Sequence, residues 1–185
     1  MNIKLLHIGL PKSGSTYLQK EIFPKLSKDL NIANLKLNQI IDERKICFHP
    51  FENKNNIEKE FPNNFILSNE NIFSHKNEFS RVLRSFEILK KNFSKDTIIL
   101  LILRDPYEYL NSFYIESVQT MYRDFQEPNN FFYLENTKTI RKNGKYNLHN
   151  FNYKYLVDLY KSYFTKVVVV KFEELNSLIF LKKIF

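Results

Sequence analysis

The chain has 185 residues, of which 43% are hydrophobic and 26% are charged. This length and composition suit one folded domain and exclude intrinsic disorder overall. The single cysteine, Cys47, excludes an internal disulfide framework and a multi-cysteine zinc site. No apolar run approaches the ~20 residues of a membrane span, and the segment from Met1 to Ser15 lacks the features of a secretion signal. We therefore expect one domain, residues 1–185, in the cytoplasm.

The net charge is +8, from 28 basic and 20 acidic residues. A basic surface attracts anions such as nucleic acids, acidic glycans or phosphorylated cofactors. We expect most of this charge to be solvated surface, because no nucleic-acid-binding motif accompanies it. The sequence therefore predicts no nucleic-acid partner.

Apolar runs and helical periodicity alternate along the chain. In the first half of the chain we expect a strand at 3–8, a helix at 16–30 with a break or kink at Pro24, a short strand at 46–48, a polar loop or frayed helix at 53–64 and a strand at 65–67. In the second half we expect a helix at 79–93, a buried strand at 98–103, a helix at 106–122, a polar excursion at 123–152, a helix at 153–160 and a strand at 167–172. This alternation predicts an α/β fold with a mostly parallel sheet and helices on both faces. Ligands of such sheets bind beyond the carboxyl ends of the strands.

Glycine is scarce, with 3 in the whole chain, yet Gly9 and Gly14 lie together just after the first predicted strand. Glycines between a strand and a helix are typical of phosphate-binding loops, where backbone N–H groups face the anion. The spacing matches a Walker A loop, but Ser15 stands where an ATPase has its lysine, and Lys12 precedes Gly14 by two positions. This displacement argues against an ordinary ATPase or GTPase. A tight turn without a ligand is the alternative.

The segment Pro11-Lys12-Ser13-Gly14-Ser15-Thr16 resembles the 5′-phosphosulfate loop of sulfotransferases that use 3′-phosphoadenosine 5′-phosphosulfate (PAPS). The resemblance implies a P-loop nucleotide hydrolase-like architecture. It also implies that Lys12 contacts the 5′-phosphate and the oxygen that bridges to sulfur. The remaining cofactor-binding residues that it implies in this loop are Pro11, Ser13, Gly14, Ser15 and Thr16.

A second motif follows the apolar run at 98–103, where Arg104 is followed eight residues later by Ser112. The segment LRDPYEYLNSFY is similar to the sulfotransferase motif in which an arginine and a serine bind the 3′-phosphate. A guanidinium suits this task because it forms bidentate contacts with phosphate. Asp105 is a possible helix cap, with Pro106 in the first turn of the helix. A magnesium-binding carboxylate at Asp105 and a surface ion pair at Arg104 are the alternatives.

Transfer to a hydroxyl needs a base near the acceptor. Glu70, just past the predicted strand at 65–67, looks like the glutamate of the Ser-x-Glu segment in carbohydrate-acting members of the family. We therefore expect Glu70 to be the general base, with a surface or capping role as the alternative. His49 is the second candidate, and His7, inside the first strand, is expected to be a packing residue.

The resemblance extends over about residues 3–175 and implies sulfuryl transfer from PAPS to an acceptor hydroxyl, on a carbohydrate, without a metal. Family members usually continue further and supply another basic loop to the cofactor, so we expect this chain to lack the C-terminal part of the domain. The basic segment 141–144 precedes the last predicted strand and is not assigned that role. An atypical P-loop kinase and a non-catalytic anion-binding domain remain the alternative functions.

Overall fold

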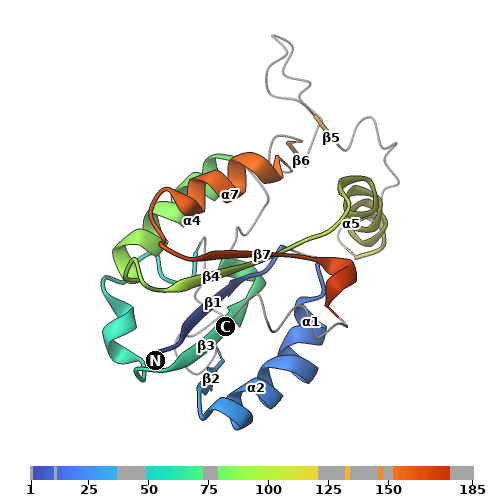
Figure 1. Ribbon diagram of the computed structural model, residues 1–185. Helices are drawn as coiled ribbons and strands as arrows, with labels where there is room; N and C mark the ends of the chain where they lie inside the picture. The colour runs from blue at the N-terminus through green and yellow to red at the C-terminus, as the bar shows by residue number, and fades with distance from the viewer. Residues whose placement is uncertain are drawn as a thin grey trace.

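The computed structural model describes residues 2–10, 12–36, 49–72, 79–120, 132–133, 146–147 and 152–175. These residues form an α/β fold in which helices lie on both sides of a central parallel sheet (Figure 1). The predicted strand at 46–48, the residue Pro11 and the basic segment 141–144 lie outside the described residues. No helix in the described part of the chain is long and apolar enough to cross a membrane.

In the described residues the central sheet has five strands in the order β2-β3-β1-β4-β7, and every pairing is parallel. The strands are β1 Lys4–Ile8, β2 Ala33–Leu35, β3 Phe65–Asn69, β4 Ile98–Leu103 and β7 Val167–Lys171. The structure thus confirms four predicted strands and the parallel sheet. The sequence analysis missed β2, which has only three residues, all half-buried.

The strand β4 shows why a continuous apolar run predicts a parallel sheet. Ile99 and Leu101 pack into the core on one face, whereas Leu100 and Ile102 pack into the core on the other. Successive side chains of a strand point to opposite faces. A strand covered on both sides must therefore be apolar at every position.

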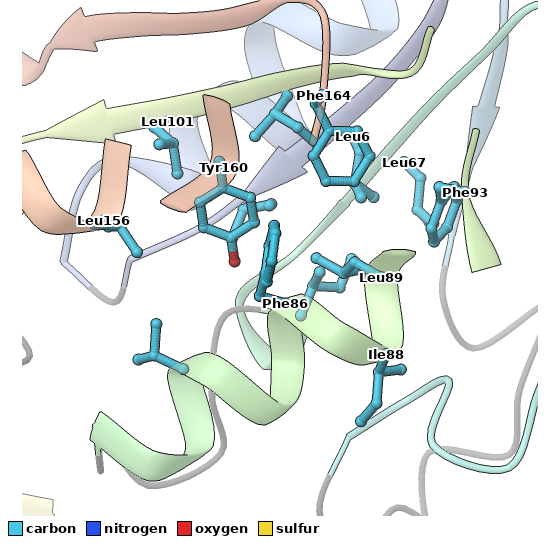
Figure 2. Close-up of a cluster of buried hydrophobic side chains, with 14 of the residues drawn as sticks. Leu6, Leu67, Phe86, Ile88, Leu89, Phe93, Leu101, Leu156, Tyr160 and Phe164 are labelled. Carbon is cyan, nitrogen blue, oxygen red and sulfur yellow. The ribbon is translucent and has the colours of Figure 1, made fainter. Parts of the chain in front are cut away.

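Two helical layers cover these faces (Figure 1). One layer contains α4 Phe79–Asn92 and α7 Tyr153–Lys161, where Phe86 and Tyr160 meet edge to face with ring centroids 5.6 Å apart (Figure 2). The other is a continuous helical segment of α1 Ser15–Tyr17, the π-helical turn η1 Leu18–Ile22 and α2 Phe23–Leu30.

The predicted break at Pro24 takes the form of the π-helical turn η1. Proline has no N–H to donate to the carbonyl four residues earlier. The backbone N–H of Phe23 instead bonds to the carbonyl of Leu18, five residues back. The break therefore widens the helix by one residue without ending it.

The remaining described elements are short except for α5 Pro106–Thr120, which follows β4. Three 3₁₀ turns are η3 Ile57–Glu60, η4 Glu70–Ile72 and η6 Phe172–Glu174. A separate parallel pair joins β5 Phe132–Tyr133 to β6 Tyr146–Asn147. The predicted polar loop at 53–64 thus contains one 3₁₀ turn, and most of the excursion at 123–152 lies outside the described residues.

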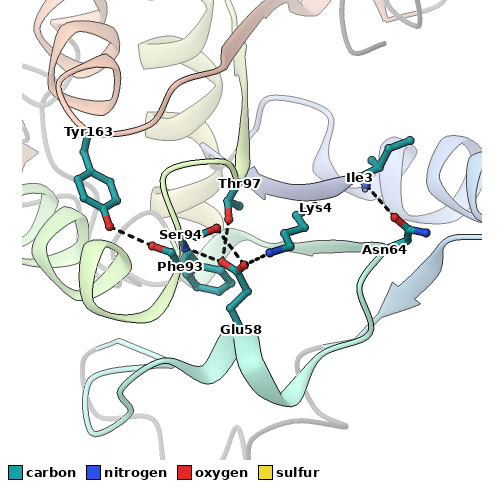
Figure 3. A network of polar contacts seen from close by, with 8 residues as sticks. All are labelled: Ile3, Lys4, Glu58, Asn64, Phe93, Ser94, Thr97 and Tyr163. Atoms are coloured by element: carbon teal, nitrogen blue, oxygen red, sulfur yellow. Dashed lines mark hydrogen bonds and ion pairs between the residues drawn. The ribbon is translucent and has the colours of Figure 1, made fainter. Parts of the chain in front are cut away.

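Glu58, in η3, bonds to residues at the amino ends of both β1 and β4 (Figure 3). Its carboxylate pairs with Lys4 and accepts hydrogen bonds from the Ser94 backbone (2.6 Å), the Ser94 hydroxyl (3.0 Å) and the Thr97 hydroxyl (2.9 Å). Burial alone would raise the pKa of this carboxyl, but Lys4 and these donors outweigh burial and hold the pKa below its ordinary value. This edge of the sheet is therefore stabilised by a saturated polar network.

Candidate functional site

The carboxyl ends of β1 and β4 are the place where the chain changes direction across the sheet. After β1 the chain leads to β2 on one side, and after β4 it leads to β7 on the other. Adjacent strands that continue in opposite directions leave space between their loops, where α/β proteins bind ligands. The loop at residues 9–16 and Arg104 follow these two strands directly.

The loop after β1 has the backbone of a strained, tight turn. Lys12 and Gly14 have φ angles of 62° and 78°, both in the left-handed region, and Gly14 is the residue before the helical segment begins at Ser15. A lysine in this conformation is uncommon, and such strain is concentrated at functional sites. Lys12 itself is half-buried, and Thr16 is exposed.

Two hydroxyls of this loop are buried without a partner. Ser13 and Ser15 are 0% and 2% exposed, and neither Oγ atom forms a hydrogen bond within the described residues. An unsatisfied buried hydroxyl costs stability, so native proteins seldom keep one without a function. The loop therefore has polar groups available for a ligand that supplies acceptor oxygens.

The loop after β1 and the residue after β4 share a neighbour, Phe172, the first residue of η6 after β7. A Cβ placed on Gly14 would lie 3.0 Å from Cε2 of Phe172 and 2.7 Å from Cδ1 of Leu175. The guanidinium carbon of Arg104 lies 4.9 Å from the centre of the Phe172 ring. Phe172 therefore lies near two segments that are about ninety residues apart in sequence. In Figure 1, η6 follows the red strand β7.

Arg104 has one ionic partner in the described residues. Its Nε donates to Oε2 of Glu108 at 3.3 Å, and its side chain is 23% exposed. Its two terminal nitrogens form no hydrogen bond within the described residues. Ser112 lies eight residues beyond Arg104, on the next turn of α5 after Glu108, and is half-buried. The serine predicted to act with Arg104 is thus on α5, the helix that begins two residues after the arginine.

Asp105 caps α5, as the sequence predicts. Its Oδ1 accepts hydrogen bonds from the backbone N–H groups of Tyr107 at 3.0 Å and Glu108 at 3.1 Å, and Pro106 begins the helix. Capping accounts for the carboxylate at this position. It thereby removes the main reason to assign a magnesium-binding role to Asp105.

Glu70 lies beside the loop after β1. It begins η4 directly after β3, and its side chain is exposed. A Cβ placed on Gly9 would lie 3.2 Å from Cγ of Glu70 and 2.7 Å from Oγ of Ser15. Only a residue without a side chain at position 9 allows both groups to lie this close to β1. The fold therefore brings the predicted base next to the predicted phosphate loop.

His49 is held by the backbone on both sides of its ring. Its Nδ1 accepts a hydrogen bond from the N–H of Phe51, and its Nε2 donates to the carbonyl of Ile72, each at 3.1 Å. Burial lowers the pKa of His49 to about 4. With both ring nitrogens in use, His49 has no lone pair left for an acceptor proton, which favours Glu70 as the base.

His7 is more than a packing residue. Its Nδ1 lies 2.7 Å from the hydroxyl of Ser68, its partner in the β1–β3 register, and this hydroxyl also accepts a bond from Nε2 of Gln19 at 3.0 Å. Burial lowers the pKa of His7 to about 3, so its ring is neutral. The network connects the helical segment after the predicted phosphate loop to the strand that leads into Glu70.

The sequence analysis did not identify Phe172 or Tyr153 as site residues. Tyr153 begins α7, and its buried hydroxyl has no hydrogen-bond partner within the described residues. Burial and, to a smaller extent, the negative charge of Asp105 raise the pKa of Tyr153, and Arg104 opposes them, so that the pKa is about 12. Tyr153 therefore lies within electrostatic reach of the residues that follow β4. In the sequence both aromatics read as ordinary apolar positions.

The chain gives no match in comparisons with known protein families. No family model matches the sequence, and no curated protein matches it. Within the described residues, no three histidine, cysteine, aspartate or glutamate side chains gather where they could hold a metal ion. We therefore infer the function from the geometry and chemistry of the residues that follow β1, β3 and β4.

Proposed function

We propose that this protein is a PAPS-dependent sulfotransferase with a P-loop-like architecture that transfers a sulfuryl group to a hydroxyl of a carbohydrate acceptor. One observation carries the proposal: the ring of Phe172 lies 4.9 Å from the guanidinium carbon of Arg104, and one of its atoms lies 3.0 Å from the position that a Cβ on Gly14 would take. The loop after β1 and the guanidinium after β4 are therefore close enough to bind two phosphates of one nucleotide. This pairing suits a nucleotide that carries phosphates at both its 3′ and 5′ positions.

The residues present fit such a ligand. The unpartnered hydroxyls of Ser13 and Ser15 would donate to the 5′-phosphate, together with backbone N–H groups of the loop. Lys12 would add a positive charge at the same phosphate. Arg104 and Ser112 would bind the 3′-phosphate, because the terminal nitrogens of Arg104 form no hydrogen bond within the described residues.

The bound nucleotide would supply the sulfuryl group, and the side chains would supply positioning and charge. Glu70 would accept the hydroxyl proton as the acceptor oxygen bonds to sulfur and the bond from sulfur to the 5′-phosphate oxygen breaks. Lys12 would stabilise the negative charge that develops on the leaving phosphate. In-line group transfer of this kind depends mostly on positioning and charge neutralisation.

Calorimetry on the full chain tests the binding part of the proposal. The ligands are 3′-phosphoadenosine 5′-phosphate (PAP), adenosine 5′-phosphate (AMP), and ATP with Mg²⁺. Charge-assisted hydrogen bonds contribute about 1.5–3 kcal/mol each, so PAP should bind at least about tenfold more tightly than AMP. Arg104→Ala should remove this difference. Arg84→Ala is the matched control, since Arg84 pairs with Glu52 on the exposed side of α4.

Tighter binding of ATP with Mg²⁺ than of PAP would contradict the proposal and favour a P-loop kinase. A transfer assay with sulfur-labelled donor and a panel of carbohydrates tests the chemistry. Lys12→Ala should lower turnover by about 10²–10³, as expected when one charge-stabilising group is lost. Lys154→Ala, at an 85% exposed position on α7, is the control. Binding of PAP without transfer to any acceptor would support a non-catalytic anion-binding domain.

A further inference from the structure

Phe172 occupies a position from which it can control the geometry of Arg104. Its ring lies 4.9 Å from the guanidinium carbon, within the range of a cation–π contact. The other contact that restrains Arg104 is its ion pair with Glu108, a single 3.3 Å contact to a side chain that is 57% exposed. Exposed pairs of this kind contribute little. Within the described residues, the aromatic ring is thus the stronger restraint on the guanidinium.

Orientation matters more for arginine than for lysine. A guanidinium is planar, and its donors form a rigid fork that binds phosphate well only in the correct plane. A free arginine side chain loses about 2 kcal/mol of rotamer entropy when it is fixed. A ring against the guanidinium fixes this plane before a ligand arrives, so less of that entropy is lost on binding.

The same ring lies close to the other predicted phosphate-binding segment. Atoms Cε2 and Cδ2 of Phe172 lie 3.0 and 3.4 Å from the position that a Cβ on Gly14 would take, where the backbone turns into the helical segment. Phe172 is therefore a neighbour both of Arg104 and of the loop after β1.

We propose that Phe172 is a positioning residue that sets selectivity for a nucleotide carrying a 3′-phosphate in addition to its 5′-phosphate. This inference rests on the proposed function. Phe172 acts through Arg104, so its loss weakens recognition of the 3′-phosphate and leaves recognition of the 5′-phosphate unchanged.

The test compares the affinities of PAP and AMP, measured by calorimetry, in Phe172→Leu, Phe172→Tyr and Arg104→Ala. Leucine keeps an apolar side chain under Gly14 but removes the aromatic face, whereas tyrosine keeps that face. A cation–π contact contributes about 0.5–2 kcal/mol, so Phe172→Leu should weaken PAP binding by about 2- to 30-fold. AMP binding should change less than twofold, and Phe172→Tyr should behave as the wild type. In the Arg104→Ala background, Phe172→Leu should have no further effect on PAP.

A merely structural role predicts a different pattern. Phe172 also packs against the core on the α1–α2 side of the sheet, so a general loosening would weaken PAP and AMP equally. Equal weakening, or no weakening of PAP, would overturn the inference and leave the proposed function intact. Failure of the wild-type protein to prefer PAP over AMP would overturn both.

A measurement without nucleotide separates the two proposals further. In wild-type protein the NMR signals of the Arg104 side chain should carry a ring-current shift from Phe172, which Phe172→Leu should abolish and Phe172→Tyr should retain. An unchanged spectrum in Phe172→Leu would overturn the positioning role whatever the ligand is.

Discussion

The two described glycines of the loop after β1 should respond very differently to alanine. Gly14 has a φ of 78°, and the added Cβ would lie 2.7 Å from Leu175 and 3.0 Å from the ring of Phe172. A left-handed conformation costs a residue with a side chain about 1–2 kcal/mol. Overpacking of a well-filled site costs about 1–3 kcal/mol more. Gly14→Ala should therefore lower the free energy of unfolding by about 2–5 kcal/mol.

Gly9→Ala meets different neighbours. Gly9 does not have a positive φ, and the closest atoms are Oγ of Ser15 and Cγ of Glu70. Both belong to side chains that can rotate away. Alanine also reduces the conformational entropy of the unfolded chain, which stabilises by about 0.4–1 kcal/mol at a compatible position. The net change in stability should stay below about 1 kcal/mol, while displacement of Glu70 and Ser15 should reduce sulfuryl transfer.

Urea unfolding followed by far-ultraviolet circular dichroism is a suitable assay, because the chain has no tryptophan for fluorescence. With a denaturant slope of about 2 kcal/mol per molar urea, Gly14→Ala should move the midpoint down by about 1–2.5 M. Gly9→Ala should move it by less than about 0.5 M. Equal shifts in the two variants, or a shift below about 0.5 M for Gly14→Ala, would refute the reasoning from backbone geometry.

Three further predictions concern other groups. Lys12→Gly should raise the free energy of unfolding by about 1 kcal/mol, because it removes a left-handed lysine. It should also lower transfer by about 10²–10³, like Lys12→Ala; urea unfolding and the transfer assay measure the two effects. Burial lowers the pKa of His7 to about 3 and of His49 to about 4, so below about pH 6.5 the unfolded chain binds more protons than the folded chain. The free energy of unfolding should therefore decrease as the pH is lowered, by up to about 1.4 kcal/mol per pH unit for each histidine. Unfolding near pH 7, 6 and 5 measures this slope, and His49→Gln should remove about half of it. Tyr153→Phe should leave the free energy of unfolding unchanged or raise it by about 1 kcal/mol, because the hydroxyl has no partner in the described residues. A decrease of about 1 kcal/mol, measured by urea unfolding, would contradict this.

Periodicity was sufficient to predict the large elements of the fold. The apolar run of β4 predicted the bounds Ile98–Leu103. The i+4 spacing of Leu18, Ile22, Leu26 and Leu30 predicted the helical segment that ends at Leu30. The edge strand β2 carried no such signal, because three half-buried residues form no pattern. Pro24 predicted an interruption of the helix, but the missing N–H does not determine whether the chain kinks, stops or widens into a π-helical turn.

Three of the predicted site residues, Lys12, Glu70 and Arg104, share one property, which is that each lies in the segment that follows a strand. In a parallel sheet all carboxyl ends lie at one edge, so the topology alone gathers Lys12, Glu70 and Arg104 there. Phe172 and Tyr153 could not be found in this way. Phe172 also follows a strand, but an aromatic residue there is equally consistent with packing, and its closeness to Arg104 and Gly14 is visible only in the structure.

The two edges of the sheet differ in how completely their polar groups are satisfied. At the amino edge, the Glu58 carboxylate combines an ion pair with three hydrogen bonds and keeps a lowered pKa. At the carboxyl edge, the hydroxyls of Ser13 and Ser15 are buried without partners and Lys12 is held in a left-handed conformation. Such groups reduce stability, and a ligand that binds them only in the folded state would offset that loss. The carboxyl edge is therefore the one that a ligand with acceptor oxygens should stabilise, whatever the rest of that ligand is.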